Sequence, residues 1–298
     1  MNKKYFHVAG MTIEVRSDLP FNKNTFASKF DAFETSGPLE ENIVLHHHFS
    51  SSLPLLELEC SDKLYFRPPW AIYQQDEQWI YQRIKPKPPH KNYYQTIVTN
   101  KEHSHLDIYN DDTIKQKFLD GNLTSLTMFP TDQILTGRLL AYKKGCIMHS
   151  LGIILDGRGY LFVGHSDAGK STMAGMMKKN GAQVLCDDRN IIRKKNDIYT
   201  LSGTWSHGDV TDVSSKTAPL VGIFFLNQSA ENRLEPVQDE TTVFESLLAC
   251  MIRPLETRDW WEKSLDFLTL AAGEISCWNL KFNKDGKVFN LIEGMSHE

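Results

Sequence analysis

The sequence predicts an α/β (α+β) protein with a mainly β domain over residues 1–125 and a mixed-sheet domain over residues 126–298. Short alternating apolar runs separated by turn residues fill the first part, as in antiparallel sheets. Strand-like and helix-like runs alternate in the second part. Several of its strands are joined by tight turns, which favours a mixed sheet over a purely parallel one.

Composition narrows the class of protein. The chain has 298 residues, 41% of them hydrophobic and 23% charged, which is typical of a soluble globular protein. Its net charge of −4 argues against nucleic acid or an anionic membrane as the main partner. No run approaches the roughly 18 apolar residues of a membrane span, and residues 1–15 lack the apolar core of a signal peptide. We therefore expect a cytoplasmic protein, for which a homo-oligomer stays open.

The five cysteines are scattered, and no two of them have the CxxC spacing of a zinc or redox motif. This distribution predicts reduced, mostly buried thiols rather than a disulfide framework.

Two hairpins are expected in the first domain. Phe6–Val8 and Met11–Val15 flank the turn Ala9-Gly10, and Trp70–Tyr73 and Trp79–Tyr81 flank a polar turn. A further strand is expected at Ile43–Leu45, and the proline-rich stretch 85–89 is expected to be a loop. We find no catalytic spacing in this domain.

A run of three histidines follows the strand at Ile43–Leu45 and invites a metal interpretation. On a strand, His46 and His48 share one face and His47 points to the other. No Cys, Asp or Glu follows at ligand spacing, so we expect a surface or partly packed strand, with a metal site as the alternative. His103 and His105 are likewise expected to be structural.

The second domain begins with a helix predicted over residues 131–142, after Pro130. Strands and helices then follow along the chain. The strands are expected at 147–155, 160–163, 183–186, 199–201 and 221–226, and the helices at 172–179, 243–251 and 261–272. A final hairpin is expected from 277–282 and 288–292, with its turn at 283–286.

A phosphate-binding motif, GxxxxGKS, lies between a strand and a helix, which is the context that the motif requires. Its residues are Gly164, His165, Ser166, Asp167, Ala168, Gly169, Lys170 and Ser171, followed by Thr172 as the helix begins. The glycines let backbone N–H groups face a phosphate chain, and the helix start adds further N–H donors. Lys170 is expected to reach the β- and γ-phosphates, and Ser171 to place its hydroxyl on Mg²⁺.

Two carboxylates and a histidine are candidates for chemistry near this loop. Asp187 and Asp188 end an apolar strand, where α/β sheets place ligand sites. One could hold Mg²⁺ and the other accept a proton from an attacking hydroxyl, although paired acids also occur as solvated turns. His149 begins the strand before the loop, and by itself would be a structural residue.

The segment 147–193 resembles the catalytic core of the HPr serine kinase/phosphorylase family, which shares its fold core with ATP-dependent phosphoenolpyruvate carboxykinase. The likeness is carried by His149, the glycines at 152, 157 and 159, the GxxxxGKS loop, and Asp187-Asp188-Arg189. It extends more weakly to residue 292, where Gly203–Gly208 and Arg253-Pro254 are similar to HPr-kinase-like proteins found beside peptide-modification genes.

This resemblance implies a P-loop kinase domain that uses ATP and Mg²⁺ to phosphorylate a serine of a protein or peptide. It implies that Asp187 or Asp188 is the general base, that His149 supports it, and that Lys170 holds phosphate. Ser171 and Asp188 would bind the metal. Arg189, His207 and Arg253 are weaker candidates for contacts to phosphate or substrate.

Two departures from the family pattern shape the alternatives. Asp167 stands where the family has glycine or another small residue, and the glycine-rich signature after the double Asp, which serves HPr, is absent. HPr itself is therefore not the expected substrate.

The alternatives are a nucleotide-binding regulatory or scaffold module without turnover, and carboxykinase-like phosphoryl transfer to a small molecule. A regulatory GTPase is disfavoured, because no DxxG follows the loop. The role expected of residues 1–125 is substrate recognition.

Overall fold

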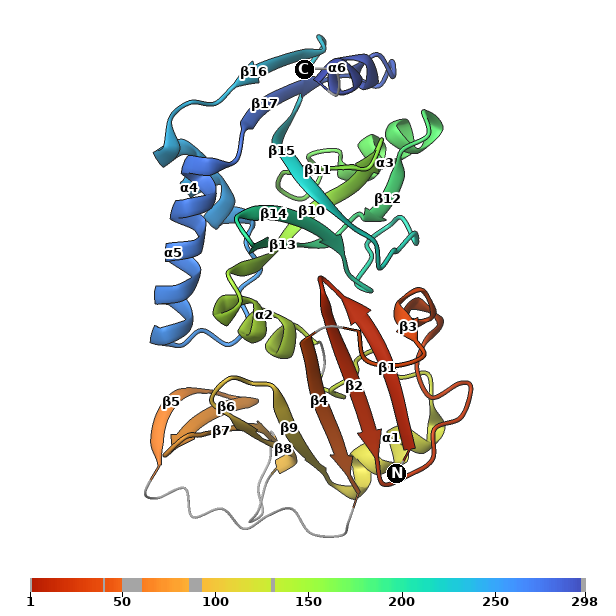
Figure 1. The fold of residues 1–298 in the computed structure, drawn as a ribbon, viewed down its shortest axis with the longest axis vertical. Helices are drawn as coiled ribbons and strands as arrows, with labels where there is room; N and C mark the ends of the chain where they lie inside the picture. Colours follow the sequence, from red (N-terminus) through yellow and green to blue (C-terminus); the bar gives the residue numbers. More distant parts are fainter. Residues whose placement is uncertain (1, 40, 50–60, 86–92, 130–131, 296–298) are drawn as a thin grey trace. The chain divides into compact units, whose positions relative to one another are not determined.

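The computed structural model describes residues 2–39, 41–49, 61–85, 93–129 and 132–295 (Figure 1). The chain divides into two compact units. The first comprises Met1–Leu139 and Pro254–Trp261, and the second comprises Leu140–Arg253 and Glu262–Glu298. The division thus falls later than the boundary predicted at residue 125, and a short C-terminal segment joins the first unit. That residues 1–125 act as a separate module stays a prediction.

The first unit contains a nine-stranded sheet in the order β3-β1-β2-β4-β9-β8-β7-β6-β5. Strands β2, β4 and β9 pair in parallel, and the other pairs are antiparallel. The strands are β1 (Asn2–Val8), β2 (Met11–Ser17), β3 (Glu34–Thr35), β4 (Glu41–His48), β5 (Asp62–Arg67), β6 (Trp70–Gln75), β7 (Gln78–Ile84), β8 (Tyr93–Asn100) and β9 (His105–Asn110).

Both predicted hairpins of this unit are confirmed. β1 pairs with β2 around Ala9-Gly10, where both residues have positive φ, and β6 pairs with β7. The predicted loop at 85–89 lies, except for Lys85, outside the described residues. The helices of the unit are η1 (Ser28–Phe33), α1 (Asp112–Asp120) and most of α2 (Gln133–Tyr142).

A buried arginine explains why Pro254–Trp261 belongs to the first unit. The Arg138 side chain is fully buried, and its guanidinium donates to Thr257 Oγ1 at 2.7 Å and to the Leu255 carbonyl at 2.8 Å. The same group lies 5.1 Å from the centre of the Trp79 ring. Because a buried charge needs such partners, these contacts tie the C-terminal segment to α2.

The second unit is built on a mixed sheet, as predicted. Five of its strands pair in a closed ring. β10 pairs with β11 and β13, β13 with β14, β14 with β15, and β15 with β11. The elements are β10 (Gly145–Leu155), β11 (Arg158–Val163), α3 (Lys170–Lys179), β12 (Gln183–Cys186), β13 (Arg189–Lys195), β14 (Ile198–Gly203), β15 (Thr217–Gln228), β16 (Arg233–Pro236), α4 (Glu240–Cys250), α5 (Arg258–Glu274), β17 (Cys277–Phe282) and α6 (Val288–Gly294).

The change of partners along β10 positions the candidate site. Residues 145–149 pair with β13, whereas residues 150–155 pair with β11 and in part with β12. Gly152 permits this crossing, because a Cβ there would lie 2.4 Å from Asn190 Oδ1. The buried Asn190 amide in turn donates to the carbonyls of Ser150 and Cys186. These contacts hold the segment between β12 and β13 against the middle of β10.

The predicted final hairpin is wrong. β17 forms as expected, but residues 288–294 form the helix α6. Both edges of β17 are already paired, one with β15 and the other with β16, so no edge remains for a hairpin partner. Val288, Phe289 and Ile292 have helical spacing, and all three are buried in the core cluster beneath α3.

Two other expectations concern the whole chain. Cys146, Cys186, Cys250 and Cys277 are free and buried, as predicted, and Cys60 lies outside the described residues. Among the helices of the described residues, none has the length and apolar character needed to cross a membrane.

Candidate phosphate-binding site

The GxxxxGKS motif forms the turn between β11 and α3, as the sequence predicts. Gly169 has a φ of +98° and directly precedes the helix, a conformation that disfavours any residue with a Cβ. A Cβ there would also lie 2.7 Å from the Phe282 ring. The Asp167 carbonyl is held by the Gln228 amide at 2.7 Å. The loop is therefore fixed by its own backbone and by β15 and β17.

Lys170 folds back over the loop. Its ammonium donates to the carbonyls of Gly164 and His165 at 2.9 and 3.0 Å, and the side chain is largely buried. Burial lowers the pKa of Lys170 from its ordinary value, and the carboxylates of the site, Asp188 among them, oppose this shift. The ammonium is thus held by carbonyls of its own loop, and its contact with phosphate stays a prediction.

Asp187 and Asp188 are adjacent in sequence but have different surroundings. Asp187 is buried, and its two oxygens accept the backbone N–H groups of Gly208 and Val210 at 2.7 and 2.8 Å. This carboxylate fastens the loop that follows β14 to the end of β12. Both oxygens of Asp187 thus already accept a hydrogen bond. Its role in catalysis stays a prediction.

Asp188 forms an ionic cluster with two residues that the sequence also singles out. His149 Nδ1 lies 2.9 Å from Asp188 Oδ1, and Arg189 Nε lies 3.2 Å from Oδ2. Burial would raise the pKa of Asp188, but the hydrogen bond with His149 and the charges of Arg189 and Lys170 lower it below its ordinary value. Asp188 is therefore ionised at neutral pH.

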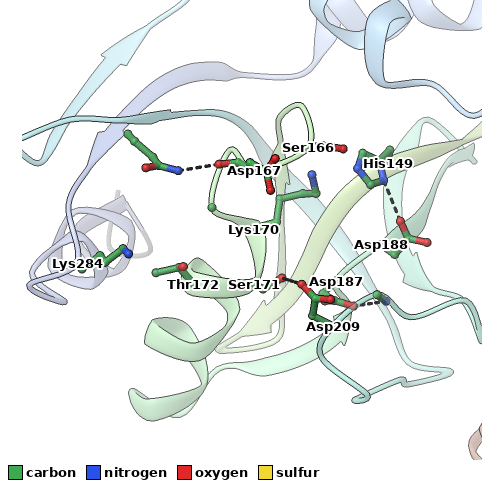
Figure 2. Close-up of a pocket in the computed structure, with 13 residues that line it drawn as sticks. His149, Ser166, Asp167, Lys170, Ser171, Thr172, Asp187, Asp188, Asp209 and Lys284 are labelled. Atoms are coloured by element: carbon green, nitrogen blue, oxygen red, sulfur yellow. Dashed lines mark hydrogen bonds and ion pairs between the residues drawn. The ribbon is translucent and has the colours of Figure 1, made fainter.

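These residues line one cavity of about 390 Å³, which Figure 2 shows between the loop and the β12–β13 junction. In this view Lys170 lies between Lys284 on one side and His149 and Asp188 on the other. Its lining residues are His149, Ser166, Asp167, Gly169, Lys170, Ser171, Thr172, Asp187, Asp188, Gly208, Asp209, Gln228 and Lys284. Of the loop, Gly164, His165 and Ala168 do not reach this lining.

Sequence reasoning missed three residues of the cavity: Asp209, Gln228 and Lys284. Asp209 Oδ2 accepts the Ser171 hydroxyl at a long 3.5 Å, and Lys284 lines the wall opposite Asp188. Asp209 follows Gly208, the last residue of a stretch already noted for its resemblance, and that proximity was the available signal. No pattern in the sequence marks Gln228 or Lys284.

The weaker candidates fall in different places. Arg189 supports Asp188, as described above. His207 is exposed, with Nδ1 3.1 Å from the Gly208 carbonyl, and Arg253 donates to the Leu248 carbonyl at 3.2 Å. Neither His207 nor Arg253 is among the residues that line the described cavity.

Comparison with solved structures finds several matching chains. No protein-family model matches the chain, and no curated protein matches it either. The solved HPr(Ser) kinase/phosphatase from Coxiella burnetii matches over 51% of this chain and 93% of its own length, at 15% identity and a TM-score of 0.30.

Proposed function

We propose that this chain is an ATP-dependent kinase that transfers phosphate to a serine hydroxyl of a protein or peptide other than HPr. The observation that carries this proposal is the cavity itself. It brings the loop lysine Lys170 and an ionised Asp188 into the lining of one space of about 390 Å³. Phosphoryl transfer needs both groups, one for the donor phosphates and one for the acceptor hydroxyl.

The donor side is supported by the loop and by two lysines. The cavity lining includes Gly169–Thr172, where α3 begins, and the first N–H groups of a helix have no acceptor within the helix and suit an anion. Lys170 and Lys284 add positive charge to the same space. A second cavity of about 180 Å³ shares Gly169, Thr172, Gln228 and Lys284 with the first and continues along Phe282. We assign the first cavity to the phosphates and the second to the nucleoside.

The acceptor side rests on Asp188. A serine hydroxyl held against this carboxylate donates its hydrogen bond to Asp188, and its oxygen is then aimed at the γ-phosphorus. As the new P–O bond forms and the bond to ADP breaks, the hydroxyl proton passes to the carboxylate. Because the transition state of phosphoryl transfer is loose, orienting the hydroxyl matters more than basic strength. A carboxylate with a lowered pKa can therefore perform this step, with His149 fixing its orientation.

The residues present fit Mg²⁺, which prefers oxygen ligands. Ser171 Oγ and Asp209 Oδ2 lie 3.5 Å apart on the cavity wall, and Asp188 faces the same space. We assign Ser171 and Asp209 as the protein ligands and keep Asp188 as a further candidate. When bound, the ion neutralises charge on the phosphate oxygens. Among the residues that the structure describes, those that line the cavity all belong to the second unit. We propose that the first unit recognises the substrate.

The decisive test is transfer from γ-labelled ATP, with Mg²⁺, to a library of serine-containing peptides, with phosphoamino acid analysis of the product. We expect phosphoserine with wild-type protein and loss of about 10²–10⁴ in rate with Asp188→Asn. The surface variant Asp212→Asn, which loses only an exposed ion pair with Lys178, serves as the matched control. Absence of labelled serine despite nucleotide binding would contradict the kinase assignment.

A nucleotide-binding regulator without turnover is the second candidate, and Asp167 favours it. This acid lines the phosphate cavity, where its charge opposes that of a bound nucleotide. A regulator would bind ATP with Mg²⁺ without releasing or transferring phosphate. Asp167→Gly distinguishes the two cases, because it should strengthen nucleotide binding in both but raise turnover only in a kinase.

A further inference from the structure

A second cluster of polar side chains lies in the first unit, on one face of the nine-stranded sheet. The histidine run forms the end of β4, as predicted, with His46 and His48 on one face. His47 points to the other face, where its Nε2 lies 2.7 Å from the Leu126 carbonyl. The register of the neighbouring strands then decides what surrounds His46 and His48.

Two aspartates reach these histidines from the strands on either side of β4. β9 runs parallel to β4 with Asp107 opposite His46, and β2 ends with Ser17 opposite His47. Asp18, the next residue, therefore comes level with His48. The Asp18 N–H donates to the His47 carbonyl at 3.2 Å and extends the pairing by one residue.

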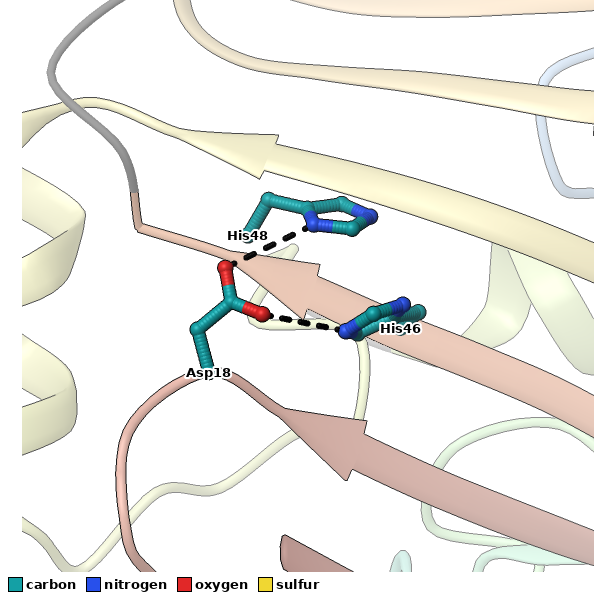
Figure 3. Close-up of side chains that lie close together, drawn as sticks. All are labelled: Asp18, His46 and His48. Atoms are coloured by element: carbon teal, nitrogen blue, oxygen red, sulfur yellow. Dashed lines mark hydrogen bonds and ion pairs between the residues drawn. The ribbon is translucent and has the colours of Figure 1, made fainter. Parts of the chain in front are cut away.

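Asp18 faces one nitrogen of each imidazole (Figure 3). Asp18 Oδ1 lies 3.1 Å from His46 Nε2, and Oδ2 lies 3.5 Å from His48 Nδ1. One ligand atom from each of these three residues lies within 4.8 Å of the others. The rings are also close to each other, with centroids 3.9 Å apart.

Asp107 faces the remaining nitrogens. Its Oδ1 lies 2.9 Å from His48 Nε2 and 3.9 Å from His46 Nδ1. The Tyr109 ring stacks on His48 at 4.8 Å and limits rotation of the imidazole. A carboxylate behind a histidine in this way is the usual arrangement of a metal-ligating imidazole, because it fixes the proton on the far nitrogen.

The count of protons shows why this arrangement suits a cation. A neutral imidazole carries one N–H, and a hydrogen bond from His48 Nε2 to Asp107 leaves a lone pair on Nδ1. That lone pair faces an oxygen of Asp18, which also offers only lone pairs. Arg16, which is level with His46, is paired with Glu14, whose Oε1 lies 2.8 Å from Arg16 Nε.

We propose that Asp18, His46 and His48 bind a divalent first-row transition ion, with Zn²⁺ as the reference ion and Asp107 as the residue that orients the imidazoles. Two imidazoles and a carboxylate are donors that Zn²⁺ accepts readily. Ligand atoms around tetrahedral zinc are about 3.3 Å apart, given bonds of about 2.0–2.1 Å. Small rotations of the three side chains would close the present separation of up to 4.8 Å.

Access and charge agree with this assignment. The Asp18 and Asp107 side chains are 43% and 34% exposed, so an ion can enter from solvent. Two carboxylates and two neutral imidazoles carry a charge of about −2, which a divalent ion balances. Bound there, the ion would fasten the end of β2 to β4 and leave a fourth coordination position open.

The test uses the full chain after removal of metal by a chelator, with ZnCl₂ and CoCl₂ as probes. We expect one ion per chain by equilibrium dialysis, a visible Co²⁺ spectrum of tetrahedral type, and a rise in melting temperature with Zn²⁺. His46→Gln and Asp18→Asn should each abolish these signals, and Asp107→Asn should weaken binding by about 10–100-fold. His46→Gln and Asp18→Asn are made separately, so that if one variant fails to fold, the other still tests the site.

The phosphate cavity is the competing place for the probe ion, since it combines His149 with Asp187, Asp188 and Asp209. His149→Gln is therefore the control, together with His207→Gln, which replaces an exposed histidine of the second unit. Both controls should keep the wild-type stoichiometry and Co²⁺ spectrum. The proposal is overturned if the wild-type chain binds no ion, or if His149→Gln loses the ion while His46→Gln keeps it.

Discussion

Asp187 and Asp188 are neighbours, yet their replacement by asparagine should have different consequences. Asp187→Asn should lose stability, whereas Asp188→Asn should lose phosphoryl transfer. In Asp187→Asn, one oxygen still accepts an N–H, but the new amide NH₂ faces the other backbone N–H, which is also a donor. The two hydrogen bonds concerned come from Gly208 and Val210, at 2.7 and 2.8 Å, to a residue that is 3% exposed, and one of them is lost. This variant should therefore lose stability.

The magnitude follows from these two contacts. A hydrogen bond to a charged group contributes about 1.5–3 kcal/mol, and a buried donor without a partner costs about 1–3 kcal/mol. We expect Asp187→Asn to reduce the free energy of unfolding by about 2–4 kcal/mol in total. For a unit of this size, that corresponds to a melting temperature lower by about 5–15 °C.

Asp188→Asn should behave in the opposite way. Its partners His149 and Arg189 remain partly exposed and can turn to water, so the loss of stability should stay near that of a surface ion pair. Phosphoryl transfer should fall by about 10²–10⁴, because the acceptor of the hydroxyl proton is gone.

Both variants are measured by calorimetry and by transfer of labelled phosphate, with Asp212→Asn as control. The reasoning is refuted if Asp187→Asn has the same melting temperature as the wild type, or if Asp188→Asn is the variant that destabilises the protein.

Three further predictions concern the loop and the first unit. Adenosine triphosphate with Mg²⁺ at 100 times its dissociation constant should stabilise the wild-type chain by about 2.7 kcal/mol, and Lys170→Ala should abolish that shift in a thermal-shift assay while Lys284→Gln reduces it. Gly169→Ala should cost about 1–3 kcal/mol and impair nucleotide binding, because the residue has φ +98° and its Cβ would lie 2.7 Å from the Phe282 ring; unchanged affinity and melting temperature would contradict this. Burial would raise the pKa of Glu14, but its hydrogen bonds lower it from 4.5 to about 2. The stabilisation, on the order of 2 kcal/mol, should be complete above pH 4.5 and lost as the pH falls toward 2, so urea unfolding of Glu14→Gln should lack this part of the acid dependence.

The sequence by itself determined the features that depend on neighbouring residues. The phosphate loop is a run of contiguous residues between a strand and a helix, and the glycine at 169 adopts the positive φ that the motif requires. The hairpin at Ala9-Gly10 likewise depends on a local turn, and His46 and His48 share a face because strands alternate. Local backbone preferences decide such elements, so they can be predicted from sequence.

Tertiary structure decided the features that depend on residues far apart in the chain. Residues 288–294 became a helix because both edges of β17 were already paired, a fact that no local pattern records. Asp187 and Asp188 look equivalent in the sequence. They differ because the backbone at Gly208 and Val210 reaches the first, whereas the His149 side chain reaches the second. The same holds for His46 and His48, whose acidic neighbours are supplied by strand register rather than by sequence spacing.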